Sequence, residues 1–78
     1  MKFRIRLYNK NIYGYIIDSK KYDSNSSDNS GAYANGITNA YAIIDSNESV
    51  CIQYEGSNDL ISINSKLILF IEHVPDNQ

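Results

Sequence analysis

Apolar and polar side chains alternate with a period of two over residues 2–8, as in a strand that has one face against a core and the other in water. The predicted inward positions are Phe3, Ile5 and Leu7, and the predicted outward positions are Lys2, Arg4, Arg6 and Tyr8. Asn9-Lys10-Asn11 then favours a turn, because asparagine tolerates the left-handed backbone conformation. An extended apolar pattern resumes over 12–18, so residues 2–18 are predicted to form a β-hairpin.

The pattern disappears after this hairpin. Residues 23–31 are nine consecutive positions without an apolar side chain, rich in Asp, Asn and Ser. Such residues bond to nearby backbone and favour turns over regular structure. We therefore expect a flexible polar loop at about 19–39, which is either functional or disordered.

A second hairpin is predicted from strands at 40–45 and 50–55, joined by a turn over 46–49. In its second strand the inward positions would be Val50, Ile52 and Tyr54, and the outward ones Cys51, Gln53 and Glu55. Residues 56–59, Gly-Ser-Asn-Asp, turn the chain once more.

The C-terminal stretch admits two interpretations. Apolar residues at 60, 63, 67 and 71 have helical spacing, which would give a helix near 59–73. The frequent isoleucines and the turn-like segment 64–66 favour two strands instead, at 60–63 and 67–73. We expect the two strands, and we expect Pro75 to end the last element in either case.

Composition supports a β fold, because twelve Ile and seven Tyr outweigh four Leu and four Ala. We expect one all-β domain over 1–78, a small barrel or a strongly bent antiparallel sheet of about five to six strands. The alternative is an α+β domain with the C-terminal helix. A core this small is thin, and an open sheet exposes its edge strands, so we also expect a homodimer through an edge strand.

Charge and cysteine usage narrow the class of protein. The net charge is −2, with +5 over residues 1–22 and −7 over 23–78. Cys51 is the only cysteine, which excludes an intrachain disulfide and favours a reducing compartment. The N-terminal residues lack the apolar stretch of an export signal, and the longest apolar run, 67–71, is too short to span a membrane. We expect a cytoplasmic protein, in its own or a host cell.

Candidate chemistry is sparse. His73, the only histidine, and Cys51 stand in no recognisable catalytic pattern. Asp23–Asp28 has alternating oxygen ligands, but Asp28 and Ala34 occupy the positions where a calcium loop needs glycine and a bidentate carboxylate. The four glycines are too far apart for a nucleotide-binding loop. We predict no enzyme activity, no cofactor and no metal.

Two kinds of binding fit the remaining features. The leading hypothesis is a protein-binding module, an inhibitor that occludes a cytoplasmic target and that a virus or mobile element would encode. Its contact residues would be the tyrosines in or beside the polar loop, Tyr22, Tyr33 and Tyr41. The alternative is binding of single-stranded nucleic acid, with cations for phosphates and aromatic rings for bases. Its residues would be Lys2, Arg4, Arg6, Tyr8, Tyr13 and Tyr15, on the outer face of the first hairpin.

Overall fold

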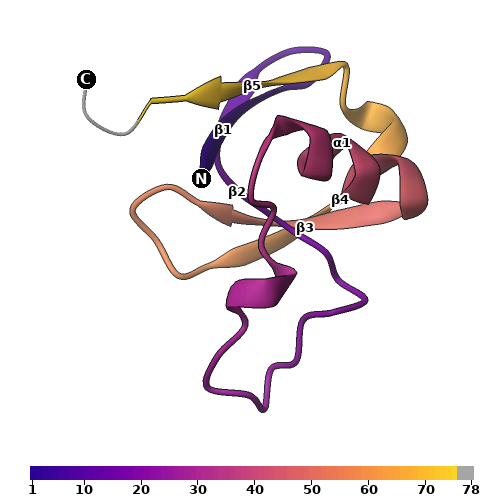
Figure 1. Cartoon of the computed structure of the whole chain (residues 1–78). Coiled ribbons are helices and arrows are strands. Elements are labelled where there is room, and N and C mark those ends of the chain that lie inside the picture. The colour runs from indigo at the N-terminus through magenta and orange to yellow at the C-terminus, as the bar shows by residue number, and fades with distance from the viewer. Residues whose placement is uncertain (76–78) are drawn as a thin grey trace.

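A computed structural model describes residues 1–75, in which five antiparallel strands form one sheet and a single α-helix lies against it (Figure 1). The strands are β1 (Lys2–Arg6), β2 (Asn11–Ile17), β3 (Ser49–Tyr54), β4 (Leu60–Asn64) and β5 (Phe70–Val74). The helix is α1 (Ile37–Ser46), and two single 3₁₀ turns are η1 (Ser30–Ala32) and η2 (Ser65–Leu67). The strand order is β4-β3-β2-β1-β5, so η2 joins the two edge strands. The expected small, sheet-dominated domain is confirmed.

The first hairpin has the predicted strands, turn and faces. Leu7 N–H donates to Lys10 O across the turn (2.8 Å), and Ile5 lies opposite Ile12. Phe3 and Ile5 are fully buried, as their alternation with polar residues predicted.

Gly14 lies where the backbones of β2 and β3 approach closely. A Cβ atom at this position would lie 2.2 Å from the backbone oxygen of Gln53, much closer than a carbon and an oxygen can approach. Gly14 is opposite Phe3 on β1, and the Phe3 side chain is completely buried. Glycine therefore permits a close approach of the β2 and β3 backbones at this position.

The core lies between the curled sheet and α1, which occupies the concave side of the sheet (Figure 1). Strands β1, β2, β3, β4 and β5 all contribute to it, and α1 adds three buried residues, Ala40, Ile43 and Ile44. Each of these helix residues removes apolar surface from water, and a buried isoleucine contributes about 1.5–3 kcal/mol.

The strand predicted at 40–45 is wrong, because α1 covers this segment. The isoleucine pair Ile43-Ile44 favours strands locally, but both side chains gain more by packing on the concave face. Side-chain hydrogen bonds lie near both ends of the helix, although its N-cap residue, Gly36, has no side-chain cap. Asn39 Oδ1 accepts from Asn35 N–H (3.1 Å), and Asn47 Nδ2 donates to the carbonyl of Ile43 (2.8 Å).

The predicted loop at 19–39 is shorter than expected and returns to the sheet. Ala34 N–H donates to Ile16 O and Asp18 N–H to Ala32 O, both at 2.8 Å, which ties the segment around η1 to the end of β2. Asn29 holds the base of the loop by accepting from Asp23 N–H and donating to Asp23 O, both at 2.9 Å. The segment has irregular backbone at about residues 18–29 and again at 34–36.

The C-terminal stretch from residue 60 follows the two-strand interpretation, and the alternative helix near 59–73 is wrong. Residues 60–64 form β4, the predicted turn becomes η2, and β5 begins at Phe70 and ends before Pro75. Tyr54 departs from its predicted inward orientation, because β3 ends there and more than a third of the residue is exposed. The sheet thus has five strands, the lower of the two numbers expected.

Candidate functional site

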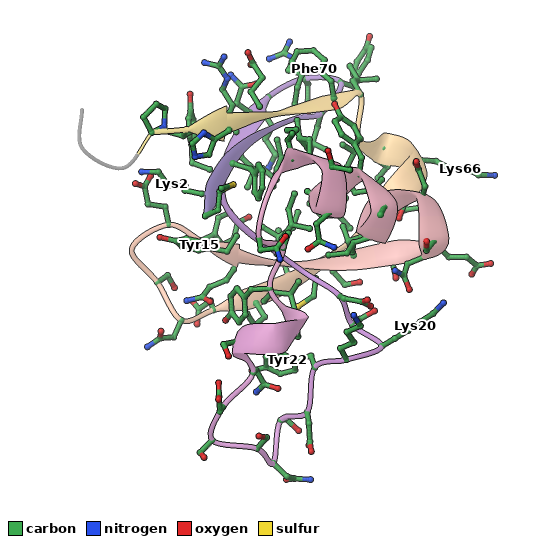
Figure 2. All side chains as sticks on the ribbon, viewed as in Figure 1. Lys2, Tyr15, Lys20, Tyr22, Lys66 and Phe70 are labelled. Atoms are coloured by element: carbon green, nitrogen blue, oxygen red, sulfur yellow. The ribbon has the colours of Figure 1, made fainter. Side chains whose placement is uncertain are left out.

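The predicted basic face exists as a geometric unit. Arg4 lies opposite Tyr13 and Arg6 opposite Asn11, so the outward side chains of β1 and β2 share one face as expected. Its two N-terminal cations are already paired, because Lys2 contacts Glu55 and Arg4 contacts Glu72 (Figure 2 labels Lys2).

These carboxylates change the electrostatics of the basic face. The Glu72 carboxylate, followed by the Tyr13 hydroxyl, raises the pKa of Arg4. Arg6 Nη1 is 3.4 Å from Asn11 Oδ1, and Tyr8 stands at the turn, 88% exposed. The basic face therefore carries two surface ion pairs beside its tyrosine rings. Its net positive charge is lower than the sequence indicated.

Tyr33 connects the polar loop to the outer face of the sheet. Its hydroxyl donates to Gln53 Oε1 on β3, while Gln53 Nε2 donates to Ser57 O (2.8 Å). Its ring meets Tyr15 edge to face, with centroids 6.5 Å apart. Burial, and then the proximity of Tyr22 and Cys51, raises the pKa of Tyr33. Tyr33 thus stabilises the fold, and Tyr22 lies partly buried beside it.

Tyr41, the third predicted contact residue, is bound to an edge strand. Its hydroxyl lies 3.1 Å from the backbone nitrogen of Ile71 and 3.4 Å from the backbone oxygen of the same residue. The tyrosines 22, 33 and 41 therefore form no single surface, and two of them use their hydroxyls within the fold.

Cys51 and His73 also have structural surroundings. Burial raises the pKa of the Cys51 thiol, so the thiol is protonated and weakly nucleophilic at neutral pH. The His73 ring packs edge to face on Phe3, with centroids 6.5 Å apart. Residues 1–75 hold no group of three or more His, Cys, Asp or Glu that could bind a metal ion.

A groove of the described residues was not predicted from the sequence. This groove, of about 720 Å³, lies between the C-terminal half of α1 and the segment that carries η2 into β5. Apolar side chains of α1 and of this segment line it, namely Tyr41, Ile44, Ile68 and Leu69. Asp45 and Glu48 contribute carboxylates, and Lys66 contributes a single cation.

Three exposed apolar residues, which we call the apolar segment, lie along the chain from η2 to the start of β5: Leu67, Leu69 and Phe70. Leu69 lines the groove, whereas Phe70 lies opposite Arg6 and faces the outer side of the sheet, since the next residue, Ile71, is buried on the concave side. The exposed fractions of the three residues are 59%, 60% and 45% (Figure 2 labels Phe70). They lie in the longest apolar run of the chain, which the sequence pattern assigned to a strand from 67 to 73. This apolar run was the one feature of the sequence that could have indicated the exposed residues. Its pattern, however, does not distinguish a buried strand from an exposed connection.

The helix end adds negative potential to the groove. The last carbonyls of a helix carry the negative end of its dipole, and Asp45, Ser46 and Glu48 line the groove where α1 ends. Lys20 Nζ donates to one of these carbonyls, Ser46 O, at 3.2 Å. Lys20 thus offsets part of the negative potential at the helix end, and the groove itself combines an apolar lining with two carboxylates and one cation.

Two further observations complete the description. No helix among residues 1–75 is long and apolar enough to cross a membrane. In comparisons with known proteins, the chain matches no family model, no curated protein and no solved structure.

Proposed function

We propose that this chain is a small, non-enzymatic protein-binding module that acts by covering a surface of a target protein. The observation that carries the proposal is Leu69, which lines the groove at the end of α1 and is 60% exposed, together with the exposed Leu67 of the same apolar segment. Leaving large apolar side chains in water forgoes the free energy of their burial, and exposed apolar side chains at a groove commonly mark interaction sites. The tyrosine-based surface expected from the sequence has less support, because Tyr33 and Tyr41 bond within the fold.

The charge of the groove indicates the chemistry of the partner. Asp45 and Glu48 outnumber Lys66 along it, while Lys20 offsets part of the negative potential of the helix C-terminus. The complementary surface on a target is one large apolar side chain flanked by Lys or Arg. We therefore propose that the module binds a basic, apolar segment of another protein and blocks that segment from other contacts, as an inhibitor does. The unpaired Cys51 favours the cytoplasm as the compartment.

Selection of peptides displayed on phage against the immobilised chain tests this function. We expect selected peptides to contain Leu, Ile or Phe next to Lys or Arg, and to shift the backbone amide resonances of 44–48 and 65–70 in a nitrogen–proton correlation spectrum. A selection that enriches no peptide, or peptides that shift only resonances outside these ranges, would contradict the proposal.

The single-stranded nucleic-acid alternative has weaker support. Its residues share a face, but Glu55 and Glu72 compensate two of its cations, and phosphate binding depends on uncompensated positive charge.

A further inference from the structure

The two edges of the sheet differ in how they are protected. The edge of β5 is contacted by the Tyr41 hydroxyl at Ile71, carries Glu72 and His73, and is followed by Pro75. These are features that prevent edge strands from pairing with other chains. The opposite edge strand, β4, has the sequence Leu-Ile-Ser-Ile-Asn, with no charge, no proline and two β-branched isoleucines.

The hydrogen-bond pattern shows which backbone groups of β4 face outward. At one end of the β3–β4 pairing Ser65 N–H donates to Glu48 O, and at the other end Tyr54 N–H donates to Asp59 O. Hydrogen-bonded and non-hydrogen-bonded residue pairs alternate along antiparallel strands, so every second pair between these two ends is hydrogen-bonded.

Ile61 and Ile63, opposite Ile52 and Val50, therefore direct their N–H and C=O groups toward β3. The backbone groups of Leu60, Ser62 and Asn64 consequently point away from the sheet, and all three residues are exposed. Five consecutive residues thus offer three unpaired donors and three unpaired acceptors at regular spacing, which is a template for another strand.

We propose that a second copy of this chain pairs with β4, antiparallel, about a two-fold axis at Ser62. With this centre, Ser62 lies opposite Ser62 of the other copy, and Leu60 lies opposite Asn64 of the other copy. Every outward backbone group of the strand then has a partner, because these three positions are the outward ones. Ile61 and Ile63 of the two copies become neighbours on the concave face of a continuous sheet, which removes the remaining exposed surface of Ile61 from water.

Charge complementarity favours a copy of the same strand in this direction. Asp59 precedes β4 and Lys66 follows Ser65 shortly after its end. Antiparallel pairing about Ser62 brings Asp59 of each copy next to Lys66 of the other, at both ends of the interface. Parallel pairing would bring like charges together instead. The paired segment is short, so we expect a dimer that dissociates in the micromolar range rather than an obligate one.

Disulfide trapping tests the interface and its register. In a Cys51→Ser background, which removes the thiol opposite position 62 on β3, we expect Ser62→Cys to form covalent dimers under mild oxidation. Residues that exchange hydrogen bonds across antiparallel strands have Cα atoms about 5.5 Å apart, within disulfide range. Leu60→Cys alone and Asn64→Cys alone should not cross-link, since each is offset from its own copy by about 13 Å, whereas a mixture of the two should. Cross-linking of Leu60→Cys with itself would overturn the register.

Sedimentation analysis from about 1 µM to 1 mM measures the association itself. We expect a concentration-dependent dimer, unchanged by Ser62→Thr and lost in Ser62→Pro, whose missing N–H points away from β3 and is not needed by the monomer. Asp59→Lys and Lys66→Asp should each weaken the dimer several-fold at low salt, and mixing these two variants should restore it as a heterodimer. A chain that stays monomeric at 1 mM, or a dimer that survives Ser62→Pro, would overturn the proposal.

Discussion

The hydroxyl of Tyr41 bonds to the backbone of Ile71 as a neighbouring strand would, with its oxygen 3.1 Å from the nitrogen and 3.4 Å from the oxygen of that residue. Leu7 bonds to Lys10, so by the antiparallel alternation Ile5 directs its backbone groups toward β2. Ile71 lies opposite Ile5, and because the backbone groups of Ile5 point to β2, this pair is not hydrogen-bonded. The backbone N–H and C=O of Ile71 therefore point toward the free edge of β5. One helix side chain thus occupies the outward groups of an edge strand and fixes α1 to it.

Tyr41→Phe tests this contact, because it removes only the hydroxyl. We expect a loss of about 1 kcal/mol in the free energy of unfolding, the usual net value of a hydrogen bond. Amide hydrogen exchange at Ile71 should become faster, which solution NMR measures directly. Tyr13→Phe is the matched control, since Tyr13 lies on the outer face, away from α1. Equal exchange rates at Ile71 in the wild type and Tyr41→Phe would contradict the contact.

Gly14→Ala tests the close approach of the β2 and β3 backbones. The added Cβ would meet the Gln53 backbone oxygen at 2.2 Å, so two strands must separate. We expect a destabilisation of about 3 kcal/mol in a urea titration, the upper part of the range for overpacked sites. Gly31→Ala is the control, because a Cβ added at Gly31 would meet no atom within 4 Å beyond its own chain neighbours, and it should change stability by less than about 0.5 kcal/mol. Similar effects of the two substitutions would show that Gly14 is not sterically required.

The Cys51 thiol should react slowly at neutral pH. Burial raises its pKa, so the thiolate fraction of the folded chain is below that of the unfolded chain at the same pH. As the pH is raised, we expect the rate of reaction with a disulfide reagent to begin to rise at a higher pH in the folded chain than in the chain unfolded by denaturant. The same shift makes a contribution to stability that is present below the unfolded pKa, about 8.5, and is lost as pH rises through the folded value. Identical pH profiles in the two states would contradict the burial of this thiol.

Nucleic-acid binding by the basic face should be weak. With Lys2 and Arg4 paired to carboxylates, we expect little binding of a labelled single-stranded oligonucleotide at low salt. Glu72→Gln should increase the affinity, because it removes the negative charge beside Arg4. Strong binding by the wild type that Arg4→Glu and Arg6→Glu abolish would instead favour the nucleic-acid alternative.

The pattern of apolar and polar residues was sufficient to predict some of the helices and strands and insufficient for others. The first hairpin follows from strict alternation and an Asn-rich turn, both of which act within a few residues. Helix α1 was missed because Ile43-Ile44 favours a strand by itself, and only the concave face of the completed sheet makes the helix preferable. The C-terminal end of α1 depends on the side-chain bond from Asn47 to Ile43, which a strand interpretation does not consider.

The candidate site was less predictable for a related reason. An apolar run is recognisable in the sequence, but whether Leu69 is buried depends on where η2 leaves β4 and which strand covers the next edge. The expected pairing of cations and aromatic rings on the first hairpin was correct in geometry. Its charge was misjudged, because Glu55 and Glu72 are distant in sequence and only the sheet order brings them to Lys2 and Arg4.

Binding by the apolar segment is tested most directly by the affinity of the tightest phage-selected peptide for three forms of the chain. Leu69→Ser should weaken binding at least tenfold relative to the wild type, because the side chain is 60% exposed and would be covered by a partner. Tyr8→Ser, which removes a side chain of an 88% exposed residue at the hairpin turn, should leave the affinity unchanged. Equal affinities of Leu69→Ser and the wild type in isothermal titration calorimetry would contradict this binding surface.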